Sequence, residues 1–260
     1  MRWFSALLGL MSLLGPMAGA EQSLEGMDRR GVPDWEIDPA FKKDAFTFAR
    51  LEPRYHRRWL TDFPDSDLNF SFRLHEMTSL LVNPYPVTLT ITDPALRDYP
   101  FVYIVEPGYM ELTEEEAKVL RDYCLSGGFI MLDDFWGPYE GAHVEREMRR
   151  IFPDRPLVDL EIEHPIFHAV FDLKEKPQLP AIDVAIRGRA QGITYEKGGE
   201  QVRYRAVLDD EGHIMILLCQ NTDLGDGWER EGDDPWYFRE FSEKKAYPMG
   251  INIIFYMMTH

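Results

Sequence analysis

The chain has 260 residues, of which 45% are hydrophobic, 13% aromatic and 28% charged. This composition is globular, and it excludes a disordered chain, a collagen-like chain and a small disulfide scaffold. Asp and Glu outnumber Lys and Arg by 45 to 28, and the formal charge of −17 argues against general binding of nucleic acid. At a typical domain size of about 150 residues, one large domain or two small ones are expected.

Residues 1–20 have the pattern of a secretory signal peptide. Arg2 precedes an apolar stretch from Trp3 to Leu14, and Ala18-Gly19-Ala20 is a small-residue pattern that signal peptidase accepts. The apolar stretch is shorter than the roughly 20 residues of a membrane span, and an uncleaved anchor is the alternative. We therefore expect a periplasmic or secreted protein with no transmembrane span after signal removal.

After the signal, a charged segment leads into strand and helix patterns. Residues 21–44 contain Gly and Pro without a hydrophobic period, which predicts a flexible N-terminal tail. Residues 45–51 alternate as a strand does, and 54–62 form a basic and aromatic loop. One apolar face from residue 65 to residue 81 predicts a helix, and 87–92 predicts a short strand.

The middle of the chain predicts a parallel sheet. The apolar run 101–105 is typical of a strand that is buried on both faces. Thr113 and Glu116 form a capping box at the start of a helix that Gly127-Gly128 ends. A strand over 129–132 and a short helix over 144–151 follow. This alternation implies parallel strands with right-handed crossovers, in a single α/β domain over residues 45–260.

The C-terminal part predicts a hairpin and a helix. Residues 202–208 and 213–219 flank the turn at 209–212, and a long helical element with a kink near Pro248 covers 236–258. Cys124 and Cys219 fall in predicted core elements, which favours two buried thiols over a disulfide.

Polar clusters follow three of the predicted strands. Ligands of open parallel sheets bind beyond the carboxyl ends of the strands. If the three strands are neighbours, their clusters meet at one acidic, Trp-bearing rim, which is the predicted site. Its residues are Glu106, Asp133, Asp134, Trp136, Asn221, Asp223, Asp226, Trp228 and Glu229.

The rim oxygens have two interpretations. Carboxylate and amide oxygens at the density of segment 221–229 suit calcium or magnesium. Asp226 stands where a helix–loop–helix calcium site needs Gly, however, and a structural loop held by Asx turns is the other interpretation. One of Asp133 and Asp134 could likewise act as a base or a metal ligand while the other caps the following turn, or both could stabilise their loop. No cofactor is predicted, with a divalent metal as the alternative.

Other motifs point to no reaction. His164 and His168 are four residues apart, but Pro165 between them argues against a zinc-binding helix, so His164 either lines the rim or belongs to a plain turn. The chain has no Gly-x-Ser-x-Gly or GxGxxG pattern. Acidic neighbours would raise the pKa of the Cys219 thiol and make it a poor nucleophile.

Two resemblances extend this interpretation. The blocks 46–50, 93–96, 99–101, 106–108, 133–137 and 221–229 cover most of residues 45–260. Together they resemble the bacterial family called domain of unknown function 4159. Residues 112–116 with 126–129, and His164-Pro165-Ile166, resemble class I glutamine-amidotransferase-like domains, including the trehalose-utilisation-like branch.

The resemblances imply a fold rather than a reaction. They imply a flavodoxin-like three-layer α/β sandwich with a mostly parallel central sheet. The amidotransferases use a Cys on a tight elbow after a strand, whereas this chain has Asp133-Asp134 at the end of strand 129–132. Glutaminase activity is therefore not expected.

Three functions stay open from the sequence. The first is non-catalytic binding, at the rim, of a small polar ligand such as a carbohydrate, or of an envelope protein. The second is a metal-dependent hydrolase that uses the rim carboxylates. The third is a structural subunit whose rim loops form an interface, in which case Trp228 would lie at that interface.

Overall fold

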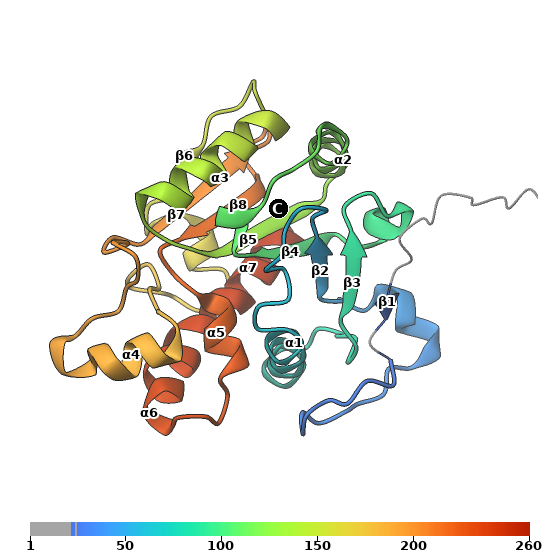
Figure 1. Cartoon of the computed structure of the whole chain (residues 1–260). Coiled ribbons are helices and arrows are strands. Elements are labelled where there is room, and N and C mark those ends of the chain that lie inside the picture. The colour runs from blue at the N-terminus through green and yellow to red at the C-terminus, as the bar shows by residue number, and fades with distance from the viewer. Residues whose placement is uncertain (1–21, 24) are drawn as a thin grey trace, which may run out of the picture.

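The computed structural model describes residues 22–23 and 25–260 (Figure 1). The predicted signal peptide, residues 1–20, lies outside the described residues. The strands form one eight-stranded sheet in the order β1-β3-β2-β4-β5-β8-β7-β6. In chain order they are β1 (Gln22–Ser23), β2 (Ala49–Glu52), β3 (Val87–Thr90), β4 (Phe101–Val105), β5 (Phe129–Phe135), β6 (Val158–Asp159), β7 (Arg203–Leu208) and β8 (Ile214–Gln220).

The five central strands are parallel, as the strand–helix alternation predicts. Strand β2 pairs in parallel with β3 and β4, β4 with β5, and β5 with β8. The antiparallel strands β1, β7 and β6 lie at the two edges. The order β3-β2-β4-β5-β8 is that of a flavodoxin-like sheet, whose direction of winding reverses between β2 and β4.

Helices cover both faces of the sheet (Figure 1). The α-helices are α1 (Asp65–Met77), α2 (Glu114–Leu125), α3 (Gly137–Ile151), α4 (Ile182–Gly188), α5 (Leu224–Glu229), α6 (Pro235–Tyr237) and α7 (Tyr247–Thr259). A π-helix, η6 (Phe238–Ala246), joins α6 to α7. The 3-10 helices are η1 (Pro39–Asp44), η2 (Pro94–Asp98), η3 (Pro107–Tyr109), η4 (Pro165–Phe167) and η5 (Arg189–Gln191).

Two hydrophobic cores lie on opposite faces of the sheet. In β4, Phe101, Tyr103 and Val105 point into one core, with α1, α5 and α7, whereas Val102 and Ile104 point into the other, with α2 and α3. A strand between two helical layers needs apolar side chains on both faces. The three-layer α/β sandwich is therefore confirmed.

The predicted bounds of helices and strands are confirmed where the sequence has a clear apolar run or a capping box. Strand β4 has its predicted bounds, and Thr113 and Glu116 form the capping box of α2. The region 236–258 is helical as predicted, and Pro248 is the second residue of α7, directly after the π-helix η6. Both cysteines are free and buried. Within the described residues, no helix has the length and apolar character that crossing a membrane requires.

Residues 25–44, in the segment predicted as a flexible tail, contact the domain. The Trp35 indole donates to the carbonyl of Val82 and stacks on His75, with ring centroids 4.5 Å apart. Arg30 pairs with Asp65 at the start of α1. Trp35 thus anchors the segment to the domain, although the charged composition of the segment does not predict this contact.

Candidate functional site

The three predicted polar clusters meet at the carboxyl edge of the sheet. Strands β4, β5 and β8 are neighbours in the sheet. Glu106 follows β4 directly, Asp133 and Asp134 lie near the carboxyl end of β5, and Asn221 follows β8. Parallel strands end at the same edge, so residues more than a hundred positions apart come together there.

Backbone strain is concentrated at this edge. Six non-glycine residues of the described chain have a positive φ, and five of them lie here. A positive φ is costly for a residue with a Cβ, and such strain clusters at functional sites. The five residues are Asp62, Glu106, Asp134, Lys197 and Asn221.

A fourth strand end contributes an acid that the sequence analysis missed. Asp62 belongs to the loop between β2 and α1, at the point where the sheet reverses its winding. Arg50 of β2, fully buried, donates to the carbonyls of Trp59 and Thr61 in this loop. The same guanidinium forms a bidentate pair with Asp67 of α1. Arg50 therefore holds the loop in the position that brings Asp62 to the edge.

The segment after β8 is a short helix rather than the predicted Asx-turn loop. Asp223 caps α5 by accepting from the backbone N–H of Asp226 at 2.8 Å. A Cβ on Gly225 would lie 2.6 Å from Asp62 Oδ2 and 2.8 Å from the Tyr103 hydroxyl. Only glycine lets α5 approach Asp62 this closely. The capping residue Asp223 is visible in the sequence, but a helix of six residues is too short to show a helical hydrophobic period.

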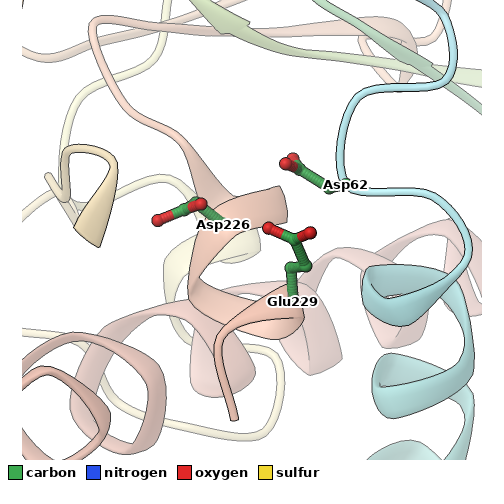
Figure 2. Close-up of side chains that lie close together, drawn as sticks. All are labelled: Asp62, Asp226 and Glu229. Atoms are coloured by element: carbon green, nitrogen blue, oxygen red, sulfur yellow. The ribbon is translucent and has the colours of Figure 1, made fainter. Parts of the chain in front are cut away.

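Three carboxylates converge between this loop and α5. Asp226 and Glu229 are three residues apart and so lie on the same side of α5, and Asp62 faces them across the gap (Figure 2). One oxygen from each side chain lies within 4.8 Å of the others. Asp62 Oδ2 is buried and accepts no hydrogen bond from the described residues. An oxygen in this state lacks a donor or a cation.

Arg230 is the cation that neutralises part of this cluster. Its Nε lies 3.2 Å from Asp226 Oδ1 and 2.7 Å from Glu229 Oε2. Asp226 Oδ2 also accepts from the backbone N–H of Ile182 and from the Tyr237 hydroxyl. The Arg230 side chain is 38% exposed, so it can leave toward solvent.

The cluster favours protonated carboxyls in the absence of further positive charge. Burial raises the pKa of Asp62 well above its usual range, and the nearby Asp226, Asp134 and Glu229 raise it further. Burial raises the pKa of Glu229 to about 7, against the opposing effect of Arg230. Crowded, desolvated carboxyls resist ionisation together, and a bound cation reverses that preference.

Asp133 lies in the floor of the site. Its side chain is fully buried, and Oδ2 accepts from the Gly225 N–H at 2.9 Å and from the Tyr103 hydroxyl at 3.2 Å. Oδ1 has no hydrogen-bond partner among the described residues. Burial raises the pKa of Asp133 to about 7, although these donors oppose the shift. The neighbouring Asp134 and Asp223 carboxyls have raised pKa values as well, chiefly through burial.

The two predicted rim tryptophans are buried rather than open to a ligand. Both are 1% exposed. Trp228 packs on Phe70 with ring centroids 4.5 Å apart and belongs to the core beneath α1. The Trp136 indole donates to Asp134 at 2.7 Å. Each tryptophan is next to a glycine in the sequence. That pattern is the same for an indole beside a pocket and for an indole inside a core, so it could not distinguish them.

Asn221 and Glu106 hold the edge together. Asn221 accepts from the Gly137 N–H at the start of α3 and donates to the carbonyl of Gln201. Glu106 accepts from the Thr61 hydroxyl and pairs with Arg58 at 2.6 Å. Both residues therefore connect strand ends to the loops around the site.

His164 does not join the predicted site. It caps η4, and its ring packs on Tyr256 of α7 with centroids 5.4 Å apart. Tyr256 hydrogen-bonds to the backbone of Ile214, the first residue of β8, which is at the amino end of that strand. His164 therefore lies in the turn at the start of η4 and not at the carboxyl edge of the sheet.

Comparison with known proteins identifies a family but no activity. The profile of a family described as "Domain of unknown function (DUF4159)" matches residues 47–258. No curated protein matches the chain.

Proposed function

We propose that this chain, which belongs to the DUF4159 family, binds a divalent metal cation at Asp62, Asp226 and Glu229. The proposal rests on the geometry of the carboxyl edge of the sheet. The observation that carries the proposal is the convergence of three carboxylates around a buried Asp62 oxygen that has no partner among the described residues. Ligands that are all oxygen suit hard cations, namely calcium, magnesium or manganese.

The charge balance supports a cation over an uncharged ligand. Arg230 is the only basic side chain that pairs with the three carboxylates within the described chain, so one positive charge faces three acids. A divalent ion would restore neutrality and satisfy Asp62 Oδ2. Two cavities of about 180 and 230 Å³ lie elsewhere, beside Asp93 and beside Trp35. The site itself is better suited to an ion than to an organic molecule bound alone.

The binding of a carbohydrate on exposed indoles has less support. Stacking on a sugar requires an accessible ring face, and Trp136 and Trp228 are in the core. For the same reason, Trp228 gives no support to an interface. The expected signal peptide at residues 1–20 leads us to propose that the site works in the periplasm or outside the cell, where calcium and magnesium are available at high concentration.

Metal binding is tested with EDTA-treated protein titrated with Mn²⁺, followed by electron paramagnetic resonance, and with Ca²⁺ and Mg²⁺ in thermal shift. We expect one Mn²⁺ per chain and a higher Tm. Asp62→Asn and Glu229→Gln should each weaken Mn²⁺ binding by about tenfold or more, because each removes a charged ligand. Arg230→Gln should tighten it, because a competing cation is gone.

The stability of the metal-free variants gives an independent readout. Asp62→Asn should raise the Tm of the metal-free protein, because it relieves carboxyl crowding, and should reduce the further rise in Tm that Mn²⁺ causes. Asp183→Asn is the matched control, since Asp183 is an exposed acid on α4 that pairs with Arg187. Unchanged Mn²⁺ affinity in Asp62→Asn and Glu229→Gln would refute the proposal.

A metal-dependent hydrolase is the second candidate. The observation in its favour is Asp133, whose pKa of about 7 suits proton transfer at neutral pH, next to Asp134 and Asp223. Mn²⁺-dependent turnover of a p-nitrophenyl ester that Asp62→Asn abolishes would support this candidate. Metal binding without turnover would leave the binding function alone.

A further inference from the structure

The loop that carries Asp62 is strongly basic. Between Pro53 and Pro64 it contains three arginines and one histidine, and Asp62 is its only acid. The chain as a whole has a formal charge of −17, so this is a local reversal of sign. Arg54, Arg57 and Arg58 are exposed. A positive surface beside an acidic cluster is suited to a ligand that carries negative charge.

Two cations of this edge lie near the same aromatic ring. The Arg58 guanidinium lies 5.1 Å from the centre of the Tyr109 ring, and the Lys197 ammonium lies 5.6 Å from the same centre. Arg58 pairs with Glu106 through Nε, and its two terminal nitrogens make no hydrogen bond to the described residues. Lys197 donates to Glu140 at 2.8 Å and is 44% exposed. Each cation thus has donors left for a further acceptor.

The position of Lys197 is imposed by the fold. Its φ is +44°, and a Cβ on Gly137 would lie 2.3 Å from the Lys197 carbonyl oxygen. On the other side of the same turn, a Cβ on Gly199 would lie 2.4 Å from Asn221 Oδ1. A strained turn that is packed this tightly fixes the backbone of Lys197 at the edge of the sheet.

A short series of contacts connects this pair of cations to the carboxylates. Arg58 lies 2.6 Å from Glu106 Oε2, and Glu106 Oε1 accepts from the Thr61 hydroxyl at 3.1 Å. Thr61 directly precedes Asp62. Lys197 also acts electrostatically on Asp134, which in turn raises the pKa of Asp62. The two charged regions are thus linked through Glu106, Thr61 and the adjacent Asp62.

We propose that Arg58 and Lys197 bind the oxyanion group, phosphate or carboxylate, of a small ligand whose other oxygens coordinate the cation at Asp62, Asp226 and Glu229. The cation part of this inference rests on the proposed function. Guanidinium groups match oxyanions with paired N–H donors, and an ammonium supplies a compact positive charge. The edge then holds a metal–oxyanion pair, with the acids on the metal and the bases on the anion.

The test is calorimetric titration of the full protein with inorganic phosphate and, separately, with acetate, with and without saturating Mn²⁺. We expect binding of at least one of these anions, tighter when Mn²⁺ is present. Arg58→Gln and Lys197→Gln should each weaken that binding by about tenfold, through loss of a charge-assisted contact, and change Mn²⁺ affinity less than about twofold. Arg187→Gln is the matched control, because Arg187 is an exposed arginine on α4.

The outcomes separate the two proposals. Anion binding that is equally strong in the Arg58→Gln, Lys197→Gln double variant overturns this inference, and so does the absence of anion binding to a protein that binds Mn²⁺. Anion binding that needs Arg58 and Lys197 in a protein that never binds Mn²⁺ supports the pair of cations and refutes the metal site. Circular dichroism of each variant establishes that the fold is intact.

Discussion

Replacing Arg50 with methionine is expected to lower the free energy of unfolding by about 3–5 kcal/mol, because it leaves the Asp67 carboxylate buried without its partner. Arg50 and Asp67 are both 0% exposed in their side chains. The substitution also removes the donor to the Trp59 and Thr61 carbonyls. Urea unfolding at neutral pH measures the loss.

The double variant Arg50→Met, Asp67→Leu separates stability from function. Replacing both members of a buried ion pair with apolar residues often restores stability, so we expect most of the loss to be recovered. Mn²⁺ affinity should nevertheless stay low, because the Trp59 and Thr61 carbonyls next to Asp62 then lack the donor that Arg50 supplies. Recovery of both stability and Mn²⁺ affinity would show that Arg50 has no positioning role.

The metal-free protein is expected to lose stability as the pH rises from about 4 to about 7, because the folded state holds Asp133 protonated over a range in which the unfolded chain releases the proton. The folded pKa of Asp133 is raised to about 7 by burial. A pKa difference of about three units corresponds to about 4 kcal/mol, which is the limit of the contribution from this one group. The contribution is complete below the unfolded pKa and disappears as the pH passes the folded pKa.

Asp133→Asn should flatten part of this pH dependence, as measured by urea unfolding at intervals between about pH 4.5 and pH 8. It should not remove all of it, because burial also raises the pKa values of Asp62, Asp223 and Asp226. Saturating Mn²⁺ should flatten the remainder by favouring the ionised carboxyls. Stability that rises between about pH 5 and pH 7 without metal would contradict the assignment of a buried, protonated Asp133.

Much of the fold could be predicted because its signals are local. An apolar run such as 101–105 buries its side chains best as a strand that is covered on both sides. The capping box of Thr113 and Glu116 supplies hydrogen-bond acceptors to its own backbone N–H groups within one turn. The alternation of strands and helices predicts β4 and β5 as parallel neighbours, whereas the position of β8 beside β5 was a condition of the predicted rim that the structure meets. The acids Asp133 and Asp226 could therefore be assigned to one edge of the sheet from strand order and strand ends.

Asp62 was overlooked and the tryptophans were misassigned for the same reason: local sequence patterns do not show which distant segments pack together. Asp62 lies in a loop whose composition is basic and aromatic, and no local pattern marks it, although the rule that found the other strand ends also applies to β2. Trp228 follows a glycine in an acidic segment, which is equally compatible with a rim and with a core. Only the packing of α5 against α1 determines that the indole is buried, and α5 in turn places Glu229 opposite Asp62.

The amino-acid sequence by itself determined an acidic α/β domain, its parallel strands and the edge at which its carboxylates gather, because periodicity and capping act over a few residues. The tertiary structure alone decided which of those carboxylates meet, because the buried Arg50 and the glycine at position 225 set the distance between a loop and a helix that lie some 160 residues apart in the chain.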